Sequence, residues 1–154
     1  MDLQPGDKAP AFKLPTDGAG EVSLAGLRGK PFVLYFYPKD STSGCTREAL
    51  EFTKLHKKFS DLGVELIGLS KDSVASHEKF KAHYRLNLTL ASDGDTKVAQ
   101  AYGVWVEKSM YGRKYMGMER ATFLVDAKGK IRQVWRKVKV SGHAKAVLAA
   151  AKAL

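Results

Sequence analysis

The apolar residues in the first half of the chain change their spacing several times. Phe32–Tyr37 and Val64–Leu69 are unbroken apolar runs rich in strand-forming residues, which is typical of strands covered on both faces. Between them, apolar residues recur every three or four positions from about 44 to 60, which predicts an amphipathic helix. Gly63 is placed to end that helix. These residues therefore predict a β-α-β unit.

The same alternation continues along the chain. Ser73 suits the N-cap of a second helix, which we expect to run to Tyr84. A short strand is expected at Leu88–Leu90 and a short helix at Asp95–Tyr102. Helices that alternate with buried strands are typical of an α/β sandwich.

Both ends of the chain add paired strands. Gly129 supplies the positive φ angle that the turn of the second pair needs. A last helix is expected to open at Ser141 or Gly142. The expected strands are Ala11–Leu14 with Glu21–Leu24, and Ala121–Val125 with Lys130–Val138.

Residues 1–154 are therefore expected to form a single α/β domain. It would have a mixed central sheet with helices on both faces and an N-terminal β-hairpin. This order of elements matches a thioredoxin-like layout, although periodicity alone does not select that fold. The segment before Arg120 is interpreted as a connection that either lines a pocket or covers the core. Its large apolar residues are Trp105, Tyr111, Tyr115 and Met116.

Composition is that of an ordinary globular protein, with 44% hydrophobic and 27% charged residues in 154. No apolar run near the start approaches the ~20 residues of a membrane span, and no signal peptide is visible, so we expect a cytoplasmic location.

The net charge of +10 is unevenly distributed along the chain, because residues 101–154 hold 12 basic and 3 acidic residues. A solvated basic face and nucleic-acid binding both fit this asymmetry, and the absence of a nucleic-acid motif favours the first.

Cys45 is the only cysteine, so a disulfide within the chain is excluded. The thiol and the four histidines are too scattered for a zinc site, and we expect neither a metal nor a cofactor. Cys45 falls in the first turn of the helix after Phe32–Tyr37, where free backbone N–H groups and the helix dipole favour an anion. Position alone leaves open a reactive thiolate or a small buried hydrophobe.

The neighbours of Cys45 favour chemistry. Pro38, Thr42 and Cys45 form the pattern P-x-x-x-T-x-x-C. A hydroxyl three residues before a thiolate can donate to the sulfur or to an oxygen bound beside it, and the proline can shield the thiolate from water. In a purely structural interpretation, Thr42 is a helix cap or a loop residue.

The segment YPKDSTSGCTREA, Tyr37–Ala49, resembles the peroxidatic motif of peroxiredoxins, most closely that of the bacterioferritin comigratory protein type. GDKAPAFKL at Gly6–Leu14 resembles the opening of the family. GMERATFLVD at Gly117–Asp126 resembles its arginine-bearing second signature, and VKVSGHA at Val138–Ala144 its last strand-to-helix junction. The resemblance spans essentially the whole chain. It implies a thioredoxin-like fold and a thiol-dependent peroxidase that reduces hydrogen peroxide and organic hydroperoxides.

The resemblance also implies roles for individual residues. Cys45 would be the peroxidatic thiolate, which becomes a sulfenic acid, and Thr42 would hydrogen-bond the peroxide. Arg120 would hold the thiolate and polarise the O–O bond, which suits a guanidinium because it is charged at every relevant pH. Pro38 would cover the site, and Glu48 would orient the arginine.

Two features depart from many members of the family. Ser43 stands where many have proline, so the loop is expected to be less rigid. The places where many carry a resolving cysteine hold Leu50 and residues such as His83 and Tyr84. We therefore expect a one-cysteine enzyme whose sulfenic acid is reduced by an external thiol such as thioredoxin, glutaredoxin or glutathione. The resemblance also implies a monomer, because relatives of this type often are.

Other functions stay open at this point. A thioredoxin-like binding or chaperone module could sense oxidants through its thiol without turnover, and the basic half leaves a nucleic-acid-binding domain as a third reading. His143 is interpreted as a capping or packing residue rather than a base.

Overall fold

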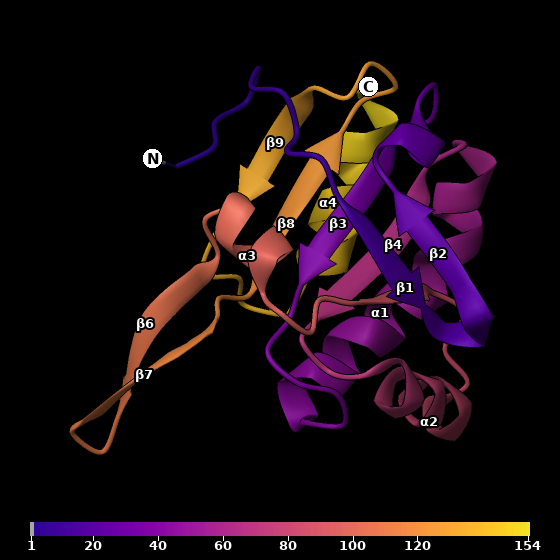
Figure 1. Ribbon diagram of the computed structural model, residues 1–154. Coiled ribbons are helices and arrows are strands. Elements are labelled where there is room, and N and C mark those ends of the chain that lie inside the picture. Colours follow the sequence, from indigo (N-terminus) through magenta and orange to yellow (C-terminus); the bar gives the residue numbers. More distant parts are fainter. Residues whose placement is uncertain (1) are drawn as a thin grey trace.

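The computed structural model describes residues 2–154, and within them seven strands form one mixed sheet in the order β2-β1-β5-β4-β3-β8-β9 (Figure 1). The strands are β1 Lys13–Thr16, β2 Gly20–Ser23, β3 Phe32–Phe36, β4 Glu65–Ser70, β5 Thr89–Ser92, β8 Ala121–Val125 and β9 Ile131–Trp135. The helices are α1 Ser43–Asp61, α2 Val74–Tyr84, α3 Lys97–Ala101 and α4 His143–Lys152, with short 3-10 turns η1 Asp17–Ala19 and η2 Ala25–Leu27.

The centre of this sheet is parallel. β3 pairs in parallel with β4, and β4 with β5, whereas β8 runs antiparallel to β3 on its other side. All five residues of β3 are buried, which explains why its sequence is apolar without alternation. The carboxyl ends of the parallel strands share one edge of the sheet, and the chain passes from β3 into α1 at that edge. Sites in α/β proteins form at such edges.

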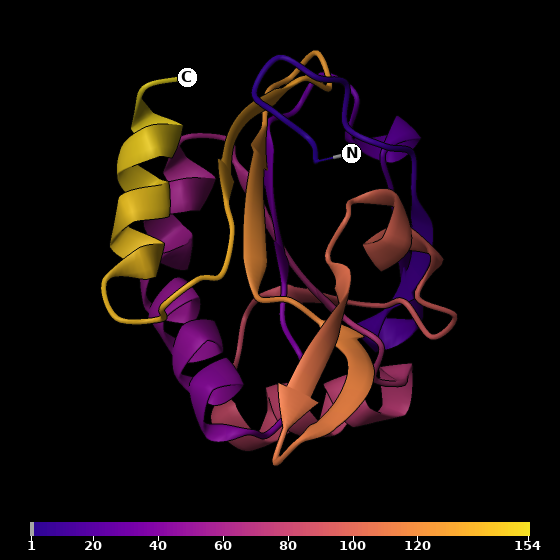
Figure 2. The ribbon, with the colours of Figure 1, turned by 90° about the vertical axis from the view of Figure 1, so that its left-hand side faces the viewer.

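Alternate side chains of β3 enter two different cores. Val33 and Tyr35 pack in the cluster beneath α1 and α4, whereas Leu34 and Phe36 pack in the cluster that α3 closes. Figure 2 shows α1 and α4 on one side of the sheet and α3 on the other. The prediction of an α/β sandwich with helices on both faces is therefore confirmed.

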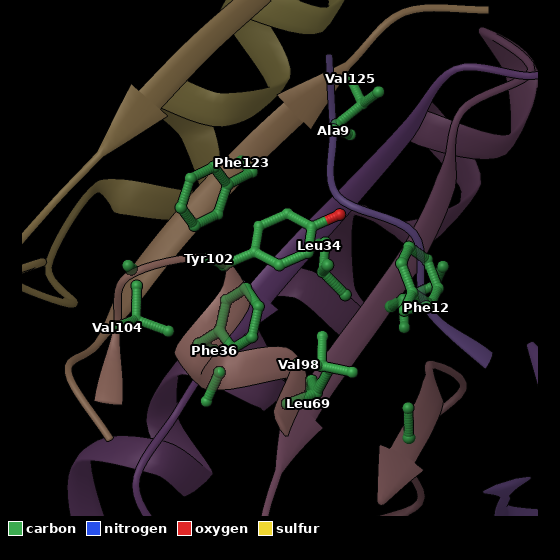
Figure 3. Packing of buried hydrophobic residues seen from close by; sticks show 14 of the residues in the cluster. Ala9, Phe12, Leu34, Phe36, Leu69, Val98, Tyr102, Val104, Phe123 and Val125 are labelled. Atoms are coloured by element: carbon green, nitrogen blue, oxygen red, sulfur yellow. The ribbon is translucent and has the colours of Figure 1, made fainter. Parts of the chain in front are cut away.

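Tyr102 fills the centre of the second of these cores. Its ring centroid lies 5.3 Å from that of Phe36 and 5.1 Å from that of Phe123 (Figure 3). Its hydroxyl donates to the Pro10 carbonyl at 2.8 Å, so the one polar atom of this side chain is satisfied. The contact ties the N-terminal segment to the core.

The signals that begin and end the helices act as predicted. The Ser73 hydroxyl accepts the Ser76 N–H at 3.1 Å and so caps α2. Gly63 follows α1 with φ 72°, and Gly142 precedes α4 with φ 75°, a conformation that glycine adopts without steric cost.

The N-terminal hairpin is confirmed. β9 ends at Trp135, earlier than expected, because Lys137 has φ 47° and its N–H turns to the Glu119 carboxylate.

The sequence predicts a connection before Arg120, and this prediction is wrong. β6 Trp105–Met110 and β7 Arg113–Met118 form an antiparallel hairpin that projects from the main sheet (Figure 1). Tyr111 at φ 52° and Gly112 at φ 78° make the two-residue turn that such hairpins prefer. Most of their side chains are exposed on both faces, so the apolar alternation that reveals a half-buried strand is missing.

Among residues 2–154, no helix combines the length and the apolar character needed to cross a membrane.

Candidate active site

Cys45 lies in the first turn of α1, next to the carboxyl end of β3. Thr42 is the N-cap of the helix, and its carbonyl accepts the Thr46 N–H at 2.8 Å. The N–H groups of a first turn have no partner inside the helix, so the thiol lies at the positive end of the helix dipole. Cys45 is only 2% exposed. Its expected position at a helix start is confirmed, and its burial means that reagents must enter a closed site.

Arg120 connects Cys45 with Glu48. It follows β7 and precedes β8, and its Nη2 donates to Cys45 Sγ at 3.3 Å while its Nη1 donates to Glu48 Oε1 at 2.7 Å. A side chain at Gly44 would meet Nη2 at 3.1 Å, so a glycine there gives the guanidinium room. Burial opposes the positive charge, but Glu48 and Cys45 outweigh it and raise the pKa of Arg120. The arginine is therefore a fixed cation in contact with the sulfur.

Glu48 is buried beneath Arg120, one turn of α1 after Cys45. Its side chain is 1% exposed, and its Oε2 has no hydrogen-bond partner among the described residues. Burial raises the pKa of Glu48 to about 7, although the charge of Arg120 acts in the opposite direction. A carboxylate with one free oxygen in such a place is costly to keep ionised.

The other two predicted site residues lie in the loop between β3 and α1. Pro38 is half-buried at the start of that loop, directly after Tyr37. The Thr42 hydroxyl donates to the Lys39 carbonyl at 2.8 Å, so its proton is not directed at the sulfur. The structure thus links Cys45, Arg120 and Glu48 by hydrogen bonds and places Thr42 and Pro38 beside them in sequence without a hydrogen bond to the sulfur.

This geometry suits a nucleophilic thiolate. A thiolate at a helix start, in contact with a guanidinium, is stabilised in the charged form that attacks electrophiles. The second arm of the same guanidinium is held by a buried carboxyl group, which limits its rotation. A donor fixed in this way can stabilise negative charge that develops beside the sulfur.

Comparisons with known proteins agree with this chemistry. Residues 5–134 match the model of the AhpC/TSA family. The chain belongs to this family. A putative peroxiredoxin bcp of Coxiella burnetii is 52% identical over 143 residues, which cover 93% of this chain and 95% of that protein. The peroxiredoxin Bcp of Bacillus subtilis is 46% identical over 143 residues, with 93% and 91% covered.

Solved structures of peroxiredoxins share the fold. The bacterioferritin comigratory protein of Xanthomonas campestris, described in a study of its alkyl peroxide reduction activity, superimposes with a TM-score of 0.88 at 46% identity. The alignment covers 92% of this chain and 90% of that one. A cysteine-to-serine mutant of Xylella fastidiosa PrxQ gives a TM-score of 0.94 at 38% identity, with 99% and 98% covered. The expected family, the thioredoxin-like fold and thiol peroxidase activity are thereby confirmed.

Sequence reasoning missed the residues that fix Arg120 in this peroxiredoxin. Arg136 binds the Glu119 carboxylate with two hydrogen bonds, of 2.6 and 3.0 Å, and the Lys137 N–H adds a third at 3.0 Å. The Arg120 carbonyl itself accepts the Val138 N–H at 3.0 Å. Glu119 precedes Arg120 in the second signature, but its partners Arg136 and Lys137 follow β9, and no local sequence pattern predicts the contact.

Lys108 is a further cation near the site. It extends from β6, and its ammonium donates to the Met118 carbonyl. Burial and the positive charge of Arg120 both lower the pKa of Lys108, while Cys45 acts the other way. The projecting hairpin therefore contributes to the electrostatics of the site, which its interpretation as a connection did not anticipate.

His143 is buried and takes no part in this arrangement. Its Nε2 lies 2.7 Å from the Thr122 hydroxyl, and its ring packs edge-on against Phe52 and Trp135. Burial and the charge of Arg120 lower the pKa of His143 to about 4, so the ring is neutral. These contacts agree with a packing role.

Replacing Glu48 with Gln is expected to make the free energy of unfolding depend less on pH than it does in the wild type. The folded-state pKa of about 7 lies above the ordinary value of 4.5, so the folded protein holds this proton more tightly than the unfolded chain does. The wild-type free energy of unfolding should therefore fall as the pH rises from about 4.5 to about 7, by on the order of 3 kcal/mol from this group. Glu48→Gln removes that loss, and urea unfolding at about pH 5 and about pH 8 measures it.

Glu65→Gln is the matched control, because Glu65 is an exposed acid on β4. Relative to Glu65→Gln, Glu48→Gln should gain free energy of unfolding between about pH 5 and about pH 8, because only Glu65→Gln keeps the buried Glu48 that ionises over this range. An equal difference at both values would show that Glu48 ionises as an ordinary carboxyl group.

Proposed function

We propose that this chain reduces peroxides with Cys45 as the attacking thiolate. The observation that carries the proposal is the 3.3 Å contact between Arg120 Nη2 and Cys45 Sγ at the start of α1. The thiolate attacks one peroxide oxygen, a new S–O bond forms and the O–O bond breaks. The electron pair of that bond leaves with the second oxygen as hydroxide or alkoxide, which then takes a proton. Cys45 becomes a sulfenic acid.

Arg120 stabilises the charge that grows on the departing oxygen. Its planar fork contacts the sulfur with one arm, so the same group lies beside the peroxide bound there. Thr42 hydrogen-bonds the bound peroxide, which requires its hydroxyl to leave the Lys39 carbonyl, and Pro38 covers the site. Glu48 keeps the fork of Arg120 oriented.

An external thiol completes the cycle. Cys45 is the only cysteine of the chain, so no second sulfur of the same molecule can attack the sulfenic acid. A first thiol displaces water and forms a mixed disulfide, and a second thiol then releases Cys45 as thiol. Thioredoxin, glutaredoxin and glutathione supply this chemistry.

Residues 1–154 act as one catalytic domain and as a monomer. Both core clusters share the same sheet, which supports a single folding unit. Reduction by an external thiol needs a compartment in which thiols are kept reduced, which fits the cytoplasm.

Steady-state peroxide consumption tests the proposal. We expect turnover of hydrogen peroxide and of an organic hydroperoxide with at least one of three reductants: thioredoxin, glutaredoxin with glutathione, or dithiothreitol. Comparing them identifies the reductant class. Formation of one sulfenic acid per chain without turnover under any reductant would instead support an oxidant sensor.

A further inference from the structure

A second buried polar cluster lies behind the loop that leads into α1, on the side of β4 and β5. His77 of α2 and Asp40 of the loop form its centre. The side chain of His77 is 0% exposed and that of Asp40 is 3% exposed. The proposed reaction uses neither residue.

The surroundings of His77 require a doubly protonated ring. Its Nδ1 lies 2.7 Å from Asp40 Oδ2, and its Nε2 lies 2.9 Å from the Ala91 carbonyl of β5. A carboxylate and a carbonyl only accept hydrogen bonds, so both ring nitrogens must donate. The Tyr37 hydroxyl, 3.4 Å from Nδ1, donates its proton to Asp40 Oδ1 at 2.6 Å and presents no second donor to the ring.

Asp40 is held from several elements at once. Besides His77 and Tyr37, the Ser76 hydroxyl of α2 donates to its Oδ2 at 2.8 Å. Its own N–H donates to Asp72 Oδ2 at 2.9 Å, in the loop after β4. These bonds fasten the loop between β3 and α1 to the rest of the sheet edge.

The fastened loop has a strained conformation next to the site. Ser41 has φ 64°, a left-handed conformation that costs free energy for a residue with a β-carbon. Ser41 is exposed, and it stands between Asp40 and the N-cap Thr42. The loop therefore needs anchors to keep this shape, and the anchors act on the residue immediately before the strained one.

We propose that His77, as a buried imidazolium, is a positioning residue for the peroxide reaction. It holds Asp40, and through Asp40 it holds the strained loop that carries Pro38 and Thr42 beside Cys45. This inference rests on the proposed function. It adds His77 to the residues on which the reaction depends, although His77 makes no hydrogen bond to the Cys45 sulfur or to Arg120.

Titration of His77 gives the arrangement a pH dependence. The charged or titratable groups that face the ring are Tyr37 and Asp40 from the end of β3 and its loop, and Asp72 from the loop after β4. Burial opposes a charge on His77, but the hydrogen bond and charge of Asp40 outweigh it and raise its pKa above 6.5. Burial likewise opposes ionisation of Asp40, but the bonds from His77 and Tyr37 lower its pKa below 3.8. The charged pair is thus intact below the raised pKa of His77 and weakens as the pH rises through that pKa.

The protonation state can be read without peroxide. In histidine ring ¹H–¹⁵N NMR spectra of the reduced wild-type protein near neutral pH, His77 should show two protonated nitrogens. Asp40→Asn removes the carboxylate and should return the ring to a neutral form. A ring with one bare nitrogen in the wild type would overturn the proposal, whatever the enzyme's activity.

Stopped-flow rates of Cys45 oxidation by hydrogen peroxide test the positioning role. His77→Asn should slow the reaction about tenfold to a hundredfold, the scale for a small misplacement of reacting groups. His83→Asn is the matched control, because His83 is exposed on the same helix, and it should stay within about twofold of wild type. The wild-type rate should decline through the His77 titration, and that step should be absent in His77→Asn.

Ser41→Gly separates positioning from general destabilisation. Glycine adopts a positive φ without cost, so this change should restore much of the rate when added to His77→Asn, yet alter the wild-type rate little. A His77→Asn rate within about twofold of wild type would overturn the proposal, as would a loss that Ser41→Gly does not relieve. If the wild type itself shows no reaction with peroxide, the proposed function fails, and the NMR result still decides the state of the ring.

Discussion

One equivalent of hydrogen peroxide is expected to add a single oxygen atom to this protein, at Cys45, and excess peroxide is expected to add a second. The first product is a sulfenic acid. No other cysteine exists in the chain to trap it, so the same sulfur stays open to further oxidation to a sulfinic acid. Intact-mass spectrometry after timed additions of peroxide measures both steps.

A monothiol added after the first equivalent of peroxide should stop this sequence. It should give a one-to-one mixed disulfide that a dithiol reverses. Cys45→Ser keeps the size of the side chain and its place beneath Arg120 but removes the sulfur, so both adducts and all turnover should disappear while the far-UV circular dichroism spectrum stays unchanged.

A disulfide between two Cys45 residues of separate chains is the competing product. We expect it to be minor, because Cys45 is only 2% exposed, and the sulfurs of two such residues cannot meet unless both sites open. A covalent dimer as the dominant species, and as the species reduced during turnover, would rule out the external-thiol mechanism.

The chain's local signals predicted most of its local structure. Neighbouring residues alone predict the strand that ends before Pro38, the helix whose first turn holds Cys45 and the cap at Ser73, and the structure confirms each. The β6–β7 hairpin could not be recognised in the same way, because most of the side chains on its strands are exposed and leave no apolar alternation. Its only local mark is the Tyr111-Gly112 turn.

The residues of the candidate site also differ in whether neighbouring sequence could reveal them. Cys45, Thr42 and Glu48 lie within one loop and one helix, and residues three apart on a helix share a face. Arg120 lies far along the chain, so only family resemblance could bring it to the thiol. His77 is buried on α2, where it shares a helix face with Phe80 three residues later. Its partner Asp40 comes from another element, so the pattern of α2 could not reveal the charge.

Replacing Arg120 is expected to slow the reaction with peroxide on the order of tenfold to a thousandfold, the scale of losing one donor to a transition state. Arg120→Met removes both the charge and the donors and should be the slower variant. Arg120→Lys keeps the charge, but a single ammonium cannot reproduce the planar fork that spans Cys45 Sγ and Glu48 Oε1. Stopped-flow measurement of Cys45 oxidation checks both variants, and Arg132→Met, a half-exposed arginine of β9, serves as the control.

The fold should survive Arg120→Met because its buried partner can become neutral. Removing one member of a buried ion pair is usually destabilising, since the other charge is left unpaired. Glu48 already has a pKa raised to about 7 by burial, so near neutral pH it can take up a proton at little cost once the arginine is gone. Adding Glu48→Gln to Arg120→Met should therefore slow the reaction no further, because the carboxylate acts only by orienting the guanidinium. A further loss of tenfold or so in the double variant would show that Glu48 acts on the sulfur or the peroxide directly.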